Sequence, residues 1–203
     1  MIQIDKIYVY NFENAVRGAR NAMNSWHLSD SSVDNGLFVM GEADLTLMKK
    51  LCKAGTSHRK FLRQIFVSID ITAPLYWWKE FDTYKVGTTA NSQSTMHKLH
   101  AKPIARGDFS HDRMNPTALA ALDRLIVTLE GLRKEFVATK DKDAWYSLIQ
   151  LLPSSYNQMR TCTMSYENLA NMYFDRKSHK LEEWRILCAE IASLPYFADM
   201  ILI

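Results

Sequence analysis

The sequence predicts an α+β fold in a single domain. Two segments, Ile2–Tyr10 and Gln64–Thr72, alternate apolar and polar residues as β-strands do. About six further segments carry apolar residues at helical spacing instead. The chain of 203 residues shows no internal repeat, linker or low-complexity tract. One domain covering residues 1–203 is therefore expected, because this length is sufficient to bury a hydrophobic core.

The second of these strands has the clearest pattern. Every odd-numbered residue from Ile65 to Ile71 is apolar, so these side chains share one face, and residues 66, 68, 70 and 72 share the other. Pro74 cannot donate a hydrogen bond to a neighbouring strand, so the strand is expected to end there.

Helical patterns account for most of the remaining chain. Gly55 and Gly87 are expected to stop two helices, and Asn115 before Pro116 supplies an N-cap and a first-turn proline. Residues 29–36 and 97–116 are expected to be irregular. The expected helices are Glu13–Met23, Glu42–Gly55, a stretch around Trp77–Phe81, Pro116 through Phe136, Ala144–Pro153, Tyr166–Phe174 and Leu181–Leu194. Their expected core-facing residues are Val16, Ala19, Met23, Leu45, Met48, Cys52, Ala118, Leu122, Leu125, Leu129, Leu132, Phe136, Leu181, Trp184, Cys188 and Ile191.

Composition argues against several classes of protein. A net charge of +3, spread along the chain, is too small to indicate nucleic acid as a partner. No apolar run reaches the ~20 residues that span a bilayer, and the N-terminal segment lacks a signal-peptide pattern. The three cysteines are far apart and odd in number, which favours buried thiols in a reducing compartment. A cytoplasmic protein with no membrane association is expected.

Few sequence motifs point to a specific chemistry. His97, His100 and His111 lie close together along the chain, but no carboxylate or cysteine completes a metal site at the usual spacing, so no metal is expected. Neither a glycine-rich phosphate loop nor a nucleophile elbow is present. The most distinctive stretch is "APLYWWKEFDTYKVGTTANSQSTMH" (residues 73–97), in which an aromatic segment leads into a run of Thr, Ser, Asn and Gln. Such a run either holds a ligand or forms a loop with local side-chain to backbone hydrogen bonds.

Three segments resemble the flavin-dependent thymidylate synthases, the ThyX family. "AVRGAR" is similar to the N-terminal helix of the family, and "FLRQIFVSIDITAPLYWWKEF" to the strand and aromatic helix before the family's signature. "LIQLLPSSYNQMRTCTMSYENLANMYFDRKSHKLEEW" is similar to its C-terminal segment, with the spacing from Leu152-Pro153 to Arg176 kept without a gap. The resemblance implies a central antiparallel or mixed sheet packed by helices.

The family signature, Arg-His-Arg followed by Ser, Asn-Glu, Ser and Arg-Tyr, is only partly retained. Aligned from Ala73-Pro74, the Arg-His-Arg positions fall on residues 83–85, where only Lys85 keeps the chemistry, and Thr88 stands for the first Ser. After one inserted residue, Asn91 and Ser94 match. The positions of the family's Glu, second Arg and Tyr are taken by Ser92, Met96 and His97.

Positions outside the signature complete the candidate site that the resemblance implies. Gln64 or Arg63 takes the place of a flavin-contacting His, while Ser165 and Glu167 replace a flavin-contacting Asn and Arg. Arg63, Lys98 and Arg160 are candidates to replace the missing cationic contacts. The resemblance therefore implies nucleotide binding by Arg176, Ser94, Asn91 and Arg160, and cofactor binding by Gln64, Lys85, Thr88 and Asn171.

The family's reaction transfers a one-carbon unit to dUMP and needs no protein nucleophile. The resemblance implies FAD as cofactor, NADPH and methylenetetrahydrofolate as co-substrates, a pyrimidine nucleotide of the dUMP type as substrate and a homotetramer as the assembly. No catalytic residue is assigned. Two readings stay open: a divergent flavin-dependent enzyme, and a non-catalytic nucleotide-binding or interaction protein that has kept the scaffold.

Overall fold

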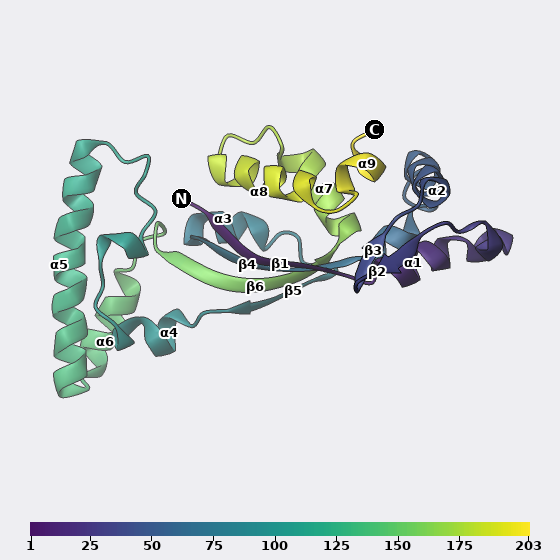
Figure 1. Ribbon diagram of the computed structural model, residues 1–203. Coiled ribbons are helices and arrows are strands. Elements are labelled where there is room, and N and C mark those ends of the chain that lie inside the picture. Colours follow the sequence, from purple (N-terminus) through teal and green to yellow (C-terminus); the bar gives the residue numbers. More distant parts are fainter. The chain divides into compact units, whose positions relative to one another are not determined.

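The computed structural model describes all residues from Met1 to Ile203, which form two compact units. Unit 1 comprises residues 1–5, 70–83 and 90–161, and unit 2 comprises residues 6–69, 84–89 and 162–203. Whether these two units form the single domain expected from the sequence is not tested by the structure, so that expectation stays a prediction. The α+β class is confirmed, because a mostly antiparallel sheet is packed by helices (Figure 1).

The main sheet has four strands in the order β1-β4-β6-β5. Its strands are β1 (Gln3–Tyr10), β4 (Phe66–Pro74), β5 (Thr88–Ser92) and β6 (Asn157–Ser165). The alternation predicted for β4 is confirmed: Ile65, Val67, Ile69 and Ile71 are at most 5% exposed. Two side-chain hydrogen bonds fix an antiparallel register between β4 and β6, because Thr161 bonds to Asp70 and Thr163 bonds to Ser68, two residues earlier.

Two strands of this sheet were missing from the sequence prediction. On β6 the inward face starts with Gln158 and Arg160 before it continues with Cys162 and Met164, so polar side chains conceal the period of two. The strand β5 is exposed along nearly its whole length and lies at the edge of the sheet, so it has no apolar face to detect.

The helices follow the predicted order with shifted ends. They are α1 (Phe12–Ala19), α2 (Glu42–Lys53), α3 (Leu75–Phe81), α4 (Thr95–Lys98), α5 (Pro116–Thr139), α6 (Lys142–Gln150), α7 (Tyr166–Arg176), α8 (Glu182–Ser193) and α9 (Phe197–Ile201). Helix α1 ends before Met23, which is 82% exposed rather than buried. Helix α3 ends at Phe81, well before Gly87. Helix α4 lies partly in the segment expected to be irregular, and α9 was not predicted.

A short hairpin replaces the loop expected at residues 29–36. Strands β2 (Ser32–Asp34) and β3 (Leu37–Val39) pair antiparallel across a two-residue turn of Asn35 and Gly36. Both turn residues have positive φ, +49° and +79°, which is the backbone that a tight hairpin requires and that Asn-Gly favours. The Asn-Gly pair was therefore the overlooked signal.

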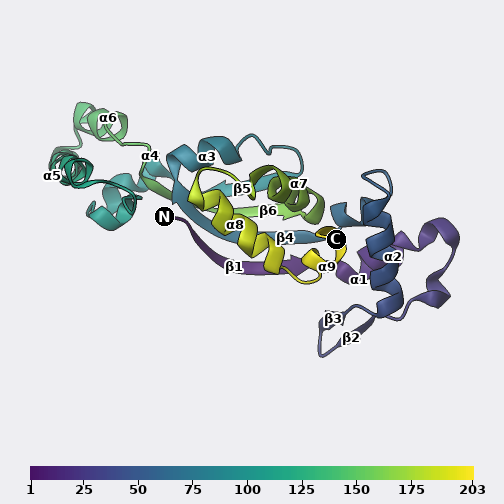
Figure 2. The ribbon, with the colours of Figure 1, turned by 90° about the horizontal axis from the view of Figure 1, so that it is seen from above.

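The core of unit 1 lies against the helical pair α5 and α6, which run side by side (Figures 1 and 2). Asn115 caps α5 as predicted, since its Oδ1 accepts a hydrogen bond from the N–H of Ala118 at 2.9 Å. Leu122 and Leu129 of α5 are buried, with Leu148 of α6 packed in the same cluster. Trp77 and Trp78 of α3 are also buried, and their rings are in edge contact.

In unit 2, α7 and α8 pack together. Leu187 and Ile191 of α8 lie against Ile7 of β1, Val67 of β4 and Met164 of β6. This packing covers one face of the strand segments that belong to the unit. Helix α7 begins at Tyr166, directly after β6 ends at Ser165.

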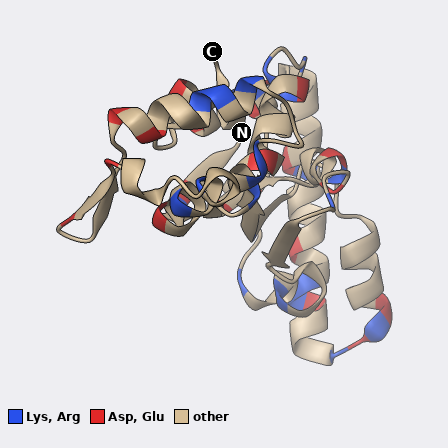
Figure 3. Ribbon diagram, turned by 90° about the vertical axis from the view of Figure 1, so that its right-hand side faces the viewer, with Lys and Arg blue, Asp and Glu red and all other residues tan.

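Charges of both signs are interspersed along the ribbon rather than gathered in one stripe (Figure 3). No helix is long and apolar enough to cross a membrane. None of the three cysteines forms a disulfide; Cys162 and Cys188 are buried, as predicted, and Cys52 is half-buried. Burial raises the pKa of the Cys188 thiol to about 11.

Candidate functional site

A cavity of about 450 Å³ in unit 2 brings together residues that are distant in sequence. It lies where β6 passes into α7, beside the segment of residues 84–89 and the start of β4. Its lining residues are Arg63, Phe66, Val86, Gly87, Ser165, Glu167, Asn168 and Asn171. This volume falls within the range of roughly 300–1,000 Å³ that small-molecule sites occupy.

The start of α7 forms one wall of this cavity and is fixed by its own side chains. Ser165 is the N-cap, and its hydroxyl accepts a hydrogen bond from the Asn168 N–H at 3.3 Å. Asn168 reciprocates, because its Oδ1 accepts from the Ser165 hydroxyl at 2.6 Å. The same amide donates from Nδ2 to the Val86 carbonyl at 2.6 Å, which joins the segment of residues 84–89 to α7.

Gly87 lies at the closest approach between this segment and α7. Its φ of +73° is in the left-handed region, and a Cβ built there would lie 3.0 Å from Oδ1 of Asn168. Glycine is required for both reasons. Two of the four cofactor-binding residues predicted from the resemblance lie near Gly87 in the sequence. Lys85 is exposed, and the buried hydroxyl Oγ1 of Thr88 has no hydrogen-bond partner.

Glu167, one of the lining residues, is held by an ion pair with the partly buried Arg59. Arg59 Nη2 donates to Glu167 Oε1 at 3.1 Å, and Arg59 Nε lies 3.0 Å from Glu167 Oε2. The guanidinium therefore contacts both carboxylate oxygens, and the second contact is an ion pair that is not aligned as a hydrogen bond. Glu167 is 8% exposed and lines the cavity, and Arg59 does not line it.

The half-buried Cys52 thiol lies in the field of this pair. Burial raises its pKa to about 11, with Arg59 opposing the rise and Glu167 adding to it. At neutral pH the thiol is therefore protonated and has little nucleophilic character.

The four cofactor-binding residues predicted from the resemblance take different positions. Asn171 lines the cavity, and Lys85 and Thr88 flank the Val86–Gly87 wall. Gln64 lies elsewhere: it lines a separate hollow with Gly18 and His58, whereas its neighbour Arg63 lines the cavity. Of the two residues considered for the flavin-contacting His position, Arg63 is thus the one at the cavity.

Arg176 ends α7 and is held by aromatic neighbours. Its Nε donates to the Tyr84 hydroxyl at 2.9 Å, and its guanidinium lies 4.8 Å from the centre of the Trp184 ring. Tyr84 in turn donates to Asp175 at 3.3 Å. Arg176 therefore contacts the first residue of the 84–89 segment, but it is not among the residues that line the cavity.

The other three residues predicted for the nucleotide lie in unit 1. Arg160 forms an ion pair with Asp82 at 2.7 Å, donates to Gln158 and stacks over the Trp78 ring at 4.2 Å. Ser94 is the N-cap of α4 and accepts from the His97 N–H at 3.1 Å, while Asn91 is exposed on β5. For Ser94, the structure therefore agrees with the second interpretation of this polar run, a segment with local side-chain to backbone hydrogen bonds.

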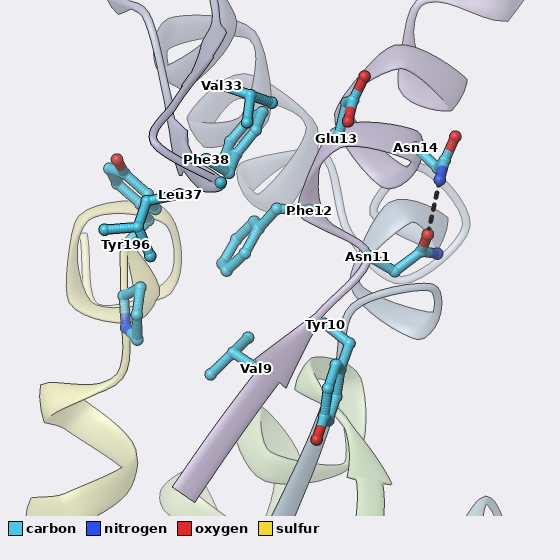
Figure 4. Close-up of a pocket in the computed structure, with 12 residues that line it drawn as sticks. Val9, Tyr10, Asn11, Phe12, Glu13, Asn14, Val33, Leu37, Phe38 and Tyr196 are labelled. Atoms are coloured by element: carbon cyan, nitrogen blue, oxygen red, sulfur yellow. Dashed lines mark hydrogen bonds between the residues drawn. The ribbon is translucent and has the colours of Figure 1, made fainter.

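A second hollow, of about 480 Å³, lies in unit 2 between the β2–β3 hairpin, the start of α1 and the turn before α9 (Figure 4). The Phe12 and Phe38 rings stack there with centres 5.6 Å apart, and the Tyr196 ring stands nearly perpendicular to both. Glu13 is its one charged lining residue. None of the residues singled out by the resemblance lines this hollow, so it is not the candidate site.

No group of three or more His, Cys, Asp or Glu side chains is arranged to hold a metal ion. The His111 ring Nδ1 is engaged by the Phe109 carbonyl at 2.8 Å, and the His100 ring packs on Phe136.

Comparison with solved structures identifies the fold. A structure of the flavin-dependent thymidylate synthase ThyX from Helicobacter pylori complexed with FAD and dUMP matches 97% of this chain and 98% of its own, with a TM-score of 0.69 and 16% identity. The fold is that of the flavin-dependent thymidylate synthases. A second structure of the same enzyme with FAD and dUMP has a TM-score of 0.71 at 16% identity, over 99% of this chain and 97% of that one.

A third match extends this fold to a related activity. The UMP/dUMP methylase PolB from Streptomyces cacaoi, bound with 5-Br dUMP, has a TM-score of 0.67 at 12% identity, covering all of this chain and 94% of its own. No protein-family model and no curated protein sequence matches the chain. The likeness therefore lies in the fold.

Sequence reasoning did not assign the lining residues Phe66, Val86, Gly87 and Asn168, nor Arg59 beside them. Arg59 and Phe66 precede and begin β4, and only the folded chain places them beside α7. Asn168 follows Ser165 by three residues, a spacing that predicts reciprocal capping and was the available signal. Gly87 stood out as a helix stop, whereas its role is the close approach to Asn168.

Proposed function

We propose that this protein binds FAD and a pyrimidine nucleotide of the dUMP type, and that the unit 2 cavity holds part of the flavin cofactor. One observation carries the proposal. Asn171, Arg63 (the alternative to Gln64) and the two residues that replace a flavin-contacting Asn and Arg, Ser165 and Glu167, all line one cavity. Of the other predicted cofactor-binding residues, Lys85 and Thr88 lie next to its Val86–Gly87 wall in the sequence and Gln64 does not line it. The ThyX structures of the same fold are complexed with FAD and dUMP.

The residues present are compatible with a nucleotide cofactor. The buried Thr88 hydroxyl, next to Gly87 in the sequence, has no hydrogen-bond partner, whereas the Glu167 carboxylate is already paired with Arg59. Gly87 lets backbone approach a ligand closely, and the Asn171 amide both donates and accepts hydrogen bonds. The exposed guanidinium of Arg63 supplies a positive charge for a phosphate.

The chain's own part in the reaction is binding and orientation. Bound reduced FAD would supply a hydride, and NADPH and methylenetetrahydrofolate are the proposed co-substrates. For the nucleotide we retain Arg176 with Asn91, Ser94 and Arg160. Tyr84 and Trp184 hold the Arg176 side chain in one orientation, so its guanidinium group loses less conformational entropy when it binds a phosphate. A cytoplasmic homotetramer is part of the same proposal.

A second candidate function is a non-catalytic nucleotide-binding or interaction protein on this scaffold. It is favoured because two side chains predicted to bind the ligand already have interaction partners within the protein. Arg160 is engaged by Asp82, Gln158 and Trp78, and the Ser94 hydroxyl caps a helix. A ligand that forgoes one charge-assisted hydrogen bond binds more weakly by roughly 1.5–3 kcal/mol, and about 1.4 kcal/mol corresponds to a tenfold change in affinity.

Equilibrium titration of FAD, followed by quenching of its fluorescence, tests the proposal. We expect saturable binding that weakens about tenfold in Arg63→Ala and in Asn171→Ala. Arg124→Ala, which changes an exposed arginine of α5 in unit 1, serves as the matched control and should bind as the wild type does. Equal affinity in all four proteins would overturn the assignment of the cavity.

A thermal-shift and turnover assay separates the two functions. A flavin-dependent enzyme is expected to be stabilised by dUMP and to oxidise NADPH when FAD is added. The non-catalytic protein is stabilised by a nucleotide without NADPH oxidation. A protein stabilised by neither FAD nor dUMP would contradict both.

A further inference from the structure

The hollow drawn in Figure 4 lies apart from the candidate site and has no part in the proposed function. It occupies about 480 Å³ in unit 2, within the range of roughly 300–1,000 Å³ that small-molecule sites occupy. Three segments build it: residues 9–14 at the end of β1 and the start of α1, residues 33 and 36–38 of the hairpin, and residues 195–196 before α9. Its walls and its charges indicate what kind of ligand it would hold.

The wall at Tyr196 is preformed. Asn11 and Tyr196 both line the hollow with positive φ, +72° and +57°, a conformation that Asn tolerates but that a bulky residue seldom adopts. The Tyr196 hydroxyl accepts a hydrogen bond from the Met40 N–H at 3.0 Å. Its ring is also in edge contact with the rings of Phe12 and Phe38. Backbone strain of this kind persists where the surroundings fix it, and it gathers at ligand sites.

The charges around the hollow are all negative. The three segments, together with α9, contain the carboxylates Glu13, Asp34 and Asp199 and no Lys, Arg or His. Glu13 is exposed and lines the hollow. Asp34 lies opposite Leu37 in the hairpin, and Asp199 is in the first turn of α9. This part of the surface is thus acidic, although the whole chain has a net charge of +3.

The start of α1 does not reverse this sign. A helix N-terminus carries a partial positive charge of roughly half a unit, and Glu13, in the first turn, carries a full negative charge. Arg17, the next cation along α1, lines a neighbouring hollow with Trp26 rather than this one. A phosphate would therefore be repelled, so the hollow is unsuited to the phosphates of FAD and dUMP.

We propose that this hollow binds a small organic cation, in which an aromatic or alkyl group carries an ammonium or guanidinium charge. The apolar part of the ligand is buried against side chains such as Val9, Leu37 and Pro195. Its charge is attracted by the Glu13 carboxylate and by the negative faces of the aromatic rings. The ligand is thus a second one, distinct from the proposed flavin and nucleotide.

Three probes that share one ring test this proposal by ligand-observed NMR titration of the full chain. They are benzylammonium, which is a cation, benzyl alcohol, which is neutral, and phenylacetate, which is an anion. We expect benzylammonium to bind about fivefold more tightly than benzyl alcohol, because it adds a contact to a carboxylate and to aromatic faces. Phenylacetate should bind most weakly. Saturating FAD should leave the binding of benzylammonium unchanged.

Two variants test the residues responsible. Glu13→Gln removes the charge from an exposed side chain, so the protein should stay folded and the ratio of the two dissociation constants should fall at least twofold. Phe38→Leu keeps an apolar side chain without a ring and should also lower the ratio. Glu42→Gln is the matched control, because Glu42 is an exposed first-turn carboxylate of α2 in the same unit that does not line the hollow. Circular dichroism verifies the fold, and Glu13→Gln alone decides if Phe38→Leu is unfolded.

The possible outcomes are distinct from those for the proposed function. Absence of benzylammonium binding, or equal dissociation constants for benzylammonium and benzyl alcohol, would overturn the proposal. A ratio that is unchanged in Glu13→Gln would overturn it as well, since the preference would then arise elsewhere. Displacement of benzylammonium by FAD would place the probe in the candidate site and would also overturn it. FAD binding itself is measured separately, so the proposed function can stand or fail independently.

Discussion

Gly87 is the residue on which the shape of the cavity depends most directly. It has a positive φ and faces Asn168, so a side chain there is both strained and in contact with the amide that joins the 84–89 segment to α7. We expect Gly87→Ala to lower the free energy of unfolding by about 1–2 kcal/mol from backbone strain, and to weaken FAD binding further.

The control for this prediction is Gly55→Ala. Gly55 has a φ of +99°, with no atom within 4 Å of a Cβ built there. It therefore incurs the backbone strain without the contact. Chemical denaturation and FAD titration of both variants measure the difference, and equal FAD affinities for the two would contradict the role given to Gly87.

Asp44 is a buried carboxyl group through which the stability of unit 2 depends on pH. It is fully buried and accepts hydrogen bonds from the hydroxyls of Ser29 and Ser31 and from Arg20, each at 2.6 Å. Burial opposes ionisation, but these hydrogen bonds outweigh it and the pKa of Asp44 is lowered. A carboxyl group of this kind stabilises the fold above its unfolded-state pKa, about 3.9, and loses that contribution as the pH falls.

We therefore expect acid to destabilise the protein through Asp44. At pH 7, Asp44→Asn should be less stable than the wild type, since it lacks the charge that Arg20 needs. The difference in free energy of unfolding should shrink as the pH falls below about 3.9 and through the lowered pKa of Asp44, because the wild-type carboxyl then becomes protonated too. Urea denaturation across this range measures it, and a difference independent of pH would count against this account.

At the scale of elements, the segment of residues 84–89 depends on α7 for its position. Tyr84 contacts Arg176 at the end of the helix, and Val86 is bonded by Asn168 near its start. Burial is the main cause that raises the pKa of the Tyr84 hydroxyl, so at neutral pH it is protonated and bonds as a neutral group.

Removing this hydroxyl is expected to loosen the segment at one end. Tyr84→Phe should cost about 1 kcal/mol of stability and increase hydrogen exchange of the amides of residues 84–89, while amides in the middle of α8 stay protected. Unchanged exchange in the 84–89 segment would show that Asn168 alone positions it.

The sequence predicted those elements whose residues carry a regular apolar period. The strand β4 and the helices α5 and α8 were predicted because their buried residues recur at periods of two or 3.6. The strand β6 was missed because polar Gln158 and Arg160 occupy inward positions, where they donate hydrogen bonds to the distant Gln93 carbonyl and Asp82 carboxylate. The site shows the same difference between local and distant contacts. Capping at Ser165 involves residues three positions apart and can be read from the sequence, whereas the Arg59–Glu167 pair joins residues 108 positions apart and cannot.

At the scale of the whole molecule, the fold matches ThyX structures over nearly the full chain, although sequence identity is 16%. Those enzymes share the fold with a UMP/dUMP methylase. The resemblance predicts a homotetramer, so light scattering should report a particle of about four chains rather than one. A stable monomer in solution would argue against a family-type assembly.

The most direct test of the central claim is the visible absorption spectrum of the protein after incubation with FAD and removal of free cofactor by gel filtration. If the unit 2 cavity holds flavin, the protein should retain the flavin absorption band, and the band should be absent or strongly reduced in Asn171→Ala. A colourless wild-type protein, or an Asn171→Ala variant as yellow as the wild type, would contradict the account.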